Sequence, residues 1–140
     1  MIRNFRIEDM DQIMQLWLDT NITAHQFIDS SYWNDNYEAV REMMPQATIY
    51  VYEQNEKIQA FAGLMENYIA GIFVSGESQS RGIGKLLLDY CKETHSELSL
   101  NVYQKNERAV RFYLREDFLT LQEKLDENTN EPEYLMEWKK

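Results

Sequence analysis

The pattern of apolar and polar positions predicts an alternation of helices and strands. Apolar side chains recur at three- and four-residue spacing in three stretches, which is typical of helices with one buried face. These stretches are Asp9 to Trp17, Tyr32 to Met44 and Gly82 to Thr94. Asp9 or Asp11 would cap the first helix. Pro45 would end the second, because a proline disfavours helical backbone at the residue before it.

Runs rich in β-branched and aromatic residues predict the strands. They cover residues 1–5, 47–52, 57–65, 68–74, 98–103, 118–121 and 134–138. The second, third and fourth runs are joined by short polar turns, so we expect an antiparallel meander. The helix after residue 74 should cross over and bring residues 68–74 and 98–103 side by side in parallel. With a short helix after Asn106, the chain is predicted to be one α/β domain over residues 1–140. It would hold a mixed sheet of six or seven strands and about four helices.

The stretch from Ser75 to Leu88 joins a buried strand to a helix and contains the most specific motif. Gln79, Gly82 and Gly84 form the pattern Q-x-x-G-x-G. It fits neither a Walker loop, whose lysine precedes Ser or Thr, nor the dinucleotide fingerprint, which needs a third glycine. Glycines let a ligand approach the backbone, and the free N–H groups of the first helical turn favour an anion. A plain tight turn before a helix is the alternative.

Charge is distributed unevenly. The net charge of −10 argues against nucleic acid as a partner. Residues 81–115 nevertheless contain seven basic and four acidic side chains, whereas residues 1–80 contain four and twelve and residues 116–140 contain three and eight. The basic segment begins at the glycine turn, where Arg81 and Lys85 would attract a phosphate or pyrophosphate.

Composition excludes several other classes of protein. At 44% hydrophobic and 13% aromatic residues, the chain can build a core and is not expected to be disordered. No apolar run approaches the roughly 20 residues of a membrane span, and the first residues lack the apolar region of a signal peptide. The single cysteine, Cys91, excludes an intramolecular disulfide and a cysteine-rich zinc site, and we expect it in the core. These features predict a cytoplasmic protein without a metal or a membrane partner.

Two motifs together resemble a known family. The glycine motif is followed, after a helix and a strand, by Asn106-x-x-Ala109-x-x-Phe112-Tyr113. This order resembles the GNAT superfamily of acyl-CoA-dependent N-acetyltransferases. The segments AHQFI, YW and NVYQKNERAVRFY look like its YjaB-like bacterial branch. The resemblance implies the GNAT fold, a mixed twisted sheet whose central parallel pair splays apart to hold the acyl group.

The resemblance also implies a cosubstrate and a set of contacts. Acetyl-CoA would bind through its pyrophosphate at the glycine turn and through its pantetheine along the preceding strand. The implied coenzyme contacts are Ile72, Val74, Gln79, Arg81, Gly82, Ile83, Gly84, Lys85 and Asn106. The acetyl group would pass to a primary amine of a small molecule, a protein lysine or an N-terminus, by direct attack in a ternary complex. A coenzyme-sensing module without turnover, or an O-acyltransferase, remains open.

Tyr113 and Glu66 are the candidate catalytic residues. A phenol with a pKa of about 10 is protonated at neutral pH and can donate to a thiolate of pKa near 8.5, so Tyr113 suits the general acid. The alternative is a tyrosine that only packs beside Phe112. Many family members place a glutamate on the strand before the glycine turn. Here the nearest carboxylate is Glu66 at the preceding turn, which makes it the candidate base or an ordinary exposed turn residue.

The acceptor site is expected near an aromatic segment. Residues 21–28 lack periodicity and predict a loop or a bent helix. His25, Phe27 and Trp33 are the candidate acceptor contacts, with Trp17 and Tyr32 in the same aromatic wall. The alternative for His25 is a packing or surface histidine. The acidic surface outside the basic segment favours a cationic acceptor. The oligomeric state is open between a monomer and a homodimer.

Overall fold

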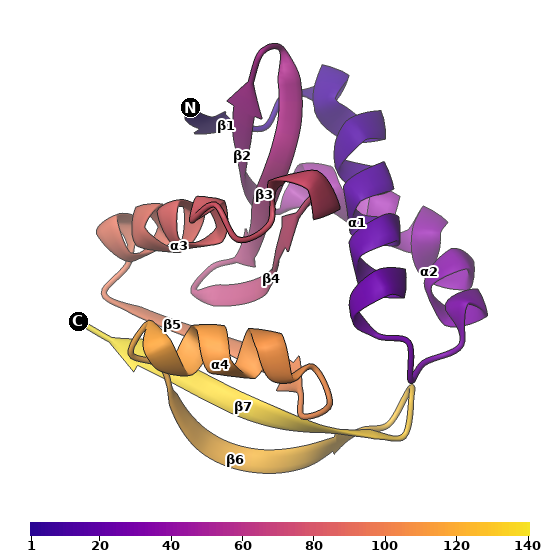
Figure 1. Ribbon diagram of the computed structural model, residues 1–140, viewed down its shortest axis with the longest axis vertical. Helices are drawn as coiled ribbons and strands as arrows, with labels where there is room; N and C mark the ends of the chain where they lie inside the picture. Colours follow the sequence, from indigo (N-terminus) through magenta and orange to yellow (C-terminus); the bar gives the residue numbers. More distant parts are fainter.

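A seven-stranded mixed sheet forms the centre of the molecule (Figure 1), with strand order β1-β2-β3-β4-β5-β7-β6. The computed structural model describes all residues from 1 to 140. The strands are β1 (Ile2–Asn4), β2 (Thr48–Gln54), β3 (Lys57–Met65), β4 (Tyr68–Val74), β5 (Glu97–Tyr103), β6 (Leu119–Asp126) and β7 (Glu131–Lys139). All neighbours pair antiparallel except β4 and β5, which pair in parallel. This confirms the predicted meander and the predicted parallel pair.

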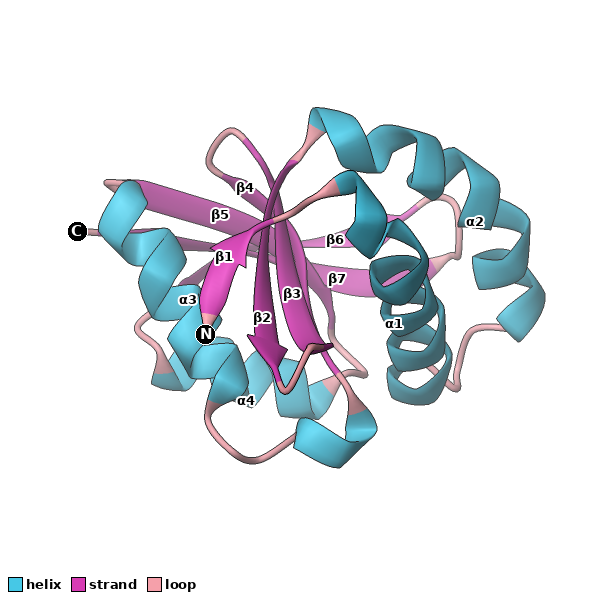
Figure 2. Cartoon of the chain, turned by 90° about the horizontal axis from the view of Figure 1, so that it is seen from above, coloured by secondary structure: helices cyan, strands magenta, loops and turns pink.

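Four α-helices cover the two faces of the sheet. They are α1 (Met10–Ala24), α2 (Ser30–Met43), α3 (Ile83–Thr94) and α4 (Glu107–Arg115). Short 3₁₀ turns lie at Ile7–Asp9, Met44–Gln46 and Gly76–Ser78. Figure 2 shows α1 and α2 on one side of the sheet and α3 and α4 on the other. None of these helices is both long and apolar enough to cross a membrane.

Asp9 occupies the predicted N-cap position of the first helix, α1, but its side chain makes no capping hydrogen bond there. Asp9 precedes α1, but its carboxylate accepts hydrogen bonds from the Arg3 guanidinium at 2.8 and 2.9 Å and from the Arg6 N–H at 2.8 Å. These bonds hold the pKa of Asp9 below its usual value, with the Arg3 contact as the largest cause. Asp11 instead pairs with Arg41 on α2 at 2.8 Å. The aspartates serve tertiary ion pairs because basic partners from other elements reach them.

Two apolar cores fill the spaces between the sheet and its helices. On the α3/α4 side, Leu98, Leu100 and Val102 of β5 are all buried, which confirms their predicted alternation. Cys91 on α3 is buried in the same core, as expected, and burial raises the pKa of its thiol to about 12. A second core on the other face packs α1 and α2 against β2, β3 and β4.

The parallel strands β4 and β5 separate soon after they meet. Only two residue pairs join them, Tyr68 with Ser99 and Ile69 with Leu100. Beyond this point β4 pairs only with β3, and β5 pairs only with β7. In Figure 1 the half of the sheet that contains β2, β3 and β4 lies at a wide angle to the half that contains β5, β6 and β7. The splayed pair that the family resemblance implied is therefore present.

Candidate active site

The glycine turn presents a row of free backbone donors. Ser80 and Gly82 adopt left-handed backbone with φ of 68° and 80°, which turns the chain sharply into α3. The N–H groups from Arg81 to Lys85 donate to no acceptor within the protein. The first that does so belongs to Leu86, which bonds the Gly82 carbonyl at 3.0 Å. Five consecutive donors at the positive end of a 12-residue helix form a site for an anion.

Arg108 on α4 forms hydrogen bonds to this turn. Its guanidinium donates to Gln79 Oε1 at 2.6 Å and to Ser80 Oγ at 3.0 Å. The Gln79 side chain in turn donates from Nε2 to the Val74 carbonyl at 3.0 Å. Both ends of the Gln79 amide are therefore bonded inside the protein. No motif marks Arg108 in the sequence, because its bonds to the turn depend on how α4 lies against the turn in the folded protein.

The two predicted basic residues of the turn differ in their surroundings. The Lys85 ammonium bonds Asp89 at 3.0 Å and Glu116 at 3.1 Å, and these contacts, Asp89 first, raise the pKa of the lysine. Arg81 is exposed and takes part in no ion pair. Arg81 and Arg108 are therefore positive charges at this end of α3 that no carboxylate of the protein compensates.

The edge of β4 that leads to the turn is open. Ile72 and Val74 are half-buried and pair with Ala62 and Ala60 of β3 on one side. On the other side β4 has no strand partner beyond Ile69. Unpaired main-chain groups along such an edge can bind an extended ligand in the manner of an added strand.

The three residues predicted to contact the acetyl acceptor, His25, Phe27 and Trp33, lie together, and His25 contacts the start of α4. The His25 ring stacks on Trp33 at 5.3 Å between centroids and meets Phe27 at 5.7 Å and Tyr103 at 5.1 Å. Its Nε2 lies 3.1 Å from Nδ2 of Asn106. The other end of the Asn106 amide accepts from the Ala109 N–H at 3.3 Å and caps α4, as predicted.

Burial keeps His25 neutral. Burial, as the dominant cause, lowers the pKa of this imidazole to about 4. Since the Asn106 amide donates to Nε2, the ring proton is assigned to Nδ1, which is buried and has no partner. The nearby indole N–H of Trp33 is also buried without an acceptor. His25 thus links the α1–α2 connection to the start of α4 as an uncharged hydrogen-bond acceptor.

Acidification is expected to destabilise the protein through His25. Because the folded pKa is lowered from 6.5 to about 4, the stability that His25 contributes is present above pH 6.5 and is lost as pH falls through 4. At about 1.36 kcal/mol per pKa unit, the full loss is roughly 3 kcal/mol. Urea unfolding at several pH values should show a smaller decline in His25→Gln than in wild type. His95→Gln, which alters the other histidine, should keep the wild-type decline; an unchanged profile in His25→Gln would refute this.

Tyr113 lies in the α3/α4 core and packs against other aromatic rings. It is 7% exposed, with ring centroids 5.1 Å from Phe112 and 5.4 Å from Phe118. Its hydroxyl makes no hydrogen bond within the protein. Burial first, then Cys91 and Tyr68, raises the pKa of this phenol well above its usual value. The hydroxyl is therefore protonated at neutral pH and free to donate.

Glu66 stands apart from the other candidates. It is exposed, has a φ of 56° in the turn between β3 and β4, and its carbonyl oxygen lies 3.1 Å from His95 Nε2. The glycine turn is at the far end of β4, roughly 20 Å away at about 3.3 Å per residue. Glu66 makes no contact with the other predicted site residues.

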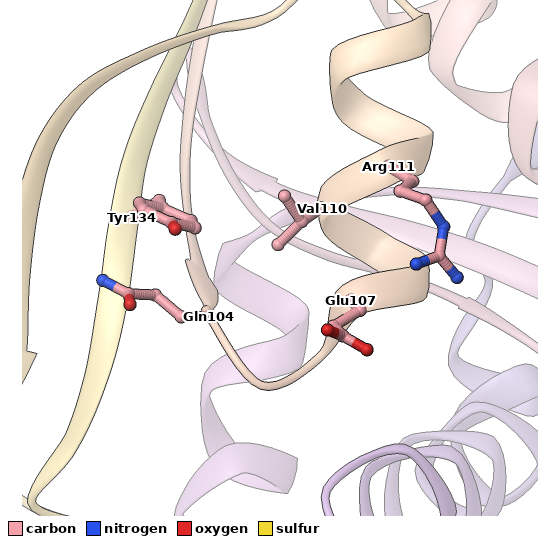
Figure 3. Close-up of a pocket in the computed structure, with 5 residues that line it drawn as sticks. All are labelled: Gln104, Glu107, Val110, Arg111 and Tyr134. Carbon is pink, nitrogen blue, oxygen red and sulfur yellow. The ribbon is translucent and has the colours of Figure 1, made fainter.

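A hollow of about 240 Å³ lies beside α4 and is shown in Figure 3. Its lining residues are Gln104, Glu107, Val110, Arg111 and Tyr134. Figure 3 shows Val110 pointing toward Tyr134. None of the predicted site residues lines this hollow. No group of three or more His, Cys, Asp or Glu side chains is placed to hold a metal ion.

Comparison with known proteins identifies the family. The family model described as the acetyltransferase (GNAT) domain matches residues 19–131. The chain belongs to the GNAT family of acetyltransferases. It is 34% identical over 140 residues to peptidyl-lysine N-acetyltransferase YiaC of Escherichia coli (strain K12), covering 99% of this chain and 96% of YiaC. Membership confirms the acetyltransferase activity that the two motifs implied.

Solved structures agree with the fold. The solution structure of apo-form YjaB from Escherichia coli has a TM-score of 0.86 at 23% identity, covering 99% of this chain and 96% of that one. An aminoglycoside 6'-N-acetyltransferase complexed with coenzyme A has a TM-score of 0.76 at 14% identity, covering 99% and 96%. The chain is also 28% identical over 119 residues to peptidyl-lysine N-acetyltransferase YjaB of Escherichia coli (strain K12), covering 84% of this chain and 80% of YjaB, in agreement with the branch that the AHQFI and NVYQKNERAVRFY segments indicated.

Proposed function

We propose that this acetyltransferase transfers the acetyl group of acetyl-CoA to the side-chain amine of protein lysine residues. The observation that carries the proposal is the run of free N–H groups from Arg81 to Lys85 at the end of an open strand edge. A relative that is 34% identical over nearly the whole chain is named a peptidyl-lysine N-acetyltransferase. The acidic surface favours a cationic acceptor such as lysine.

The proposed coenzyme site follows β4 and the glycine turn. The N–H groups of Arg81 to Lys85 would hold the pyrophosphate, and the β4 edge at Ile72 and Val74 would pair with the pantetheine. Gln79 shapes the turn, since its side chain is bonded to Val74 and Arg108. Asn106 would approach the coenzyme from the start of α4. The acetyl group would then lie where β4 and β5 separate.

The proposed reaction is a direct transfer within a ternary complex. The neutral amine forms a bond to the acetyl carbon, and the carbon–sulfur bond breaks. Tyr113 would donate its phenolic proton to the departing thiolate sulfur. Glu66 is the base that the sequence suggested; its exposed position gives that role no structural support.

Thiol release separates the proposed function from its alternatives. Purified protein is mixed with acetyl-CoA and a lysine peptide, with a matched peptide whose lysine is already acetylated, or with a serine peptide. We expect free thiol only with the unmodified lysine peptide, and a mass increase on its side chain. Calorimetric binding of acetyl-CoA without thiol release from any acceptor would favour a sensing module. Release with the serine peptide alone would indicate O-acyl transfer.

The affinity for acetyl-CoA is expected to weaken as salt is added. The charge of Arg81 should contribute more to this salt dependence than the charge of Lys85. Arg81 is free to face a phosphate, whereas Lys85 is bound to Asp89 and Glu116. Salt screens exposed charges, so the wild-type Kd should rise roughly tenfold from low to high ionic strength. Calorimetry should show weaker binding and a flatter salt dependence in Arg81→Ala, with a smaller change in Lys85→Ala. A wild-type Kd that is the same at low and high ionic strength would contradict this expectation.

We also place the reaction in the cytoplasm, a proposal that rests on the single cysteine of the sequence. Free thiols persist in a reducing compartment, and Cys91 is buried and unpaired. The proposed site is built from one copy of the chain and does not require a homodimer.

A further inference from the structure

A buried hydrogen-bond acceptor without a donor lies where β4 and β5 separate. Asn101 is the first residue of β5 beyond the last pair between the two strands, Ile69 with Leu100. Its Nδ2 donates to the Tyr68 hydroxyl at 2.9 Å. Its Oδ1 is buried and accepts no hydrogen bond. A buried acceptor without a hydrogen bond destabilises a folded protein, so its presence in a structure calls for an explanation.

The side chain of Asn101 lies on the α1/α2 face of the sheet. Its neighbours Leu100 and Val102 both point into the α3/α4 core, and successive side chains of a strand alternate between faces. Tyr113, the proposed acid, belongs to that α3/α4 core. The unpartnered oxygen and the phenol therefore lie on opposite faces of the sheet.

Glu133 on β7 adds an unpaired carboxylate to this face. In the β5–β7 register it lies opposite Tyr103, while Asn101 lies opposite Leu135, so Glu133 and Asn101 are diagonal neighbours on one face. Diagonal neighbours are on the order of 7–8 Å apart, within reach of a bound side chain that touches both. Glu133 is half-buried, and its carboxylate forms no ion pair. Burial, followed by the charge of Asp126, raises its pKa, whereas Lys124, which lies opposite Glu133 on β6, lowers it.

The other nearby carboxylates are engaged. Asp126 accepts a hydrogen bond from the Tyr103 hydroxyl at 2.6 Å, and Glu131 pairs with Lys105 at 3.0 Å. Glu133 is thus the carboxylate on this side of the strand separation that lacks a donor.

We propose that the acceptor lysine enters from the α1/α2 face, donates an N–H to Asn101 Oδ1 and loses a proton to the Glu133 carboxylate. This inference rests on the proposed function and supplies the base that Glu66 does not. An ammonium offers several donors and a positive charge, which match an unpartnered amide oxygen and an unpaired carboxylate.

Glu133 and Tyr113, on opposite faces of the sheet, together account for every proton in the reaction. The ammonium gives one proton to Glu133, which later releases it to water. The neutral amine forms the carbon–nitrogen bond to the acetyl carbon, and the carbon–sulfur bond breaks. The thiolate takes a proton from Tyr113, which leaves a phenolate, and the second proton of the attacking nitrogen reaches this phenolate through solvent. The products are the acetylated lysine, the free thiol and one proton in solution.

The test compares Glu133→Gln with Glu137→Gln in acetyl transfer to a lysine peptide. Glu137 lies on the same strand and face, two positions beyond Leu135, and is a matched control. Glu133→Gln should lower kcat about 10²–10³-fold and remove the acidic limb of the pH–rate profile. Asn101→Ala should raise the peptide KM roughly tenfold, because it removes one contact to the bound amine, while Asn101→Asp, which keeps an oxygen there, should recover it.

Coenzyme binding distinguishes this inference from the proposed function. Calorimetry should give all these variants the acetyl-CoA affinity of wild type, which also shows that they are folded. A wild-type protein that acetylates no lysine peptide would overturn the proposed function itself. A wild-type protein that does so, together with a Glu133→Gln variant of unchanged rate and pH profile, would overturn the inference alone.

Discussion

Valine at Gly82 or Gly84 is expected to abolish acetyl-CoA binding while the protein stays folded. Gly82 has a φ of 80°, so a side chain there strains the backbone by roughly 1–2 kcal/mol. A Cβ at Gly82 would meet no atom of the protein within 4 Å. At Gly84 a Cβ would lie 3.7 Å from the Phe112 ring and 3.8 Å from a Val74 methyl, both ordinary contacts. The fold therefore tolerates substitution, whereas a phosphate that needs bare backbone does not.

Calorimetric titration with acetyl-CoA checks this expectation. We expect the Kd of Gly82→Val and Gly84→Val to rise more than about 100-fold, since several charge-assisted hydrogen bonds are lost together. Gly76→Val is the matched control: Gly76 lies earlier in the same connection, has open space around it and no left-handed backbone. Circular dichroism would confirm that each variant is folded. Wild-type affinity in a folded Gly84→Val protein would remove the glycine turn from the coenzyme site.

Tyr113→Phe is expected to slow acetyl transfer without loss of the fold. The substitution removes one hydroxyl that bonds no other protein group, and the ring contacts with Phe112 and Phe118 remain. A positioned general acid is worth about 10²–10⁴-fold in rate. Burial raises the pKa of this phenol, so complete transfer to a thiolate of pKa near 8.5 is uphill. We therefore expect a loss near the lower end of that range, carried largely by a hydrogen bond to the developing thiolate.

The loss should fall on kcat rather than on coenzyme affinity, because the proton is needed in the transition state. Single-turnover transfer to a lysine peptide measures the chemical step directly. Tyr90→Phe is a suitable control, since Tyr90 packs against the same α3/α4 core from α3 and has no proposed role. If Tyr113→Phe transfers acetyl at the wild-type rate, Tyr113 is a core residue and not the acid.

Local sequence determined the parts of the site that are close together in the chain. The strand before Ser75, the glycines at 82 and 84 and the helix that follows were all evident from residue pattern. Such a strand–turn–helix unit needs only neighbouring residues to adopt it. The cap that Asn106 provides for α4 was predictable for the same reason, since it joins residues three apart.

Tertiary structure decided which side chains from distant segments meet. The contact between His25 and Asn106 spans 81 residues, and that between Tyr68 and Asn101 spans 33. Both depend on the order and register of the sheet, in which β7 lies between β5 and β6. That insertion places Glu133 beside the open end of β5, while Glu66 remains in the exposed turn before β4. Residue pattern specifies which face of a strand is buried, but strand order follows from how all the apolar faces pack at once. The position of Glu133, the proposed base, could therefore not be found from the sequence alone.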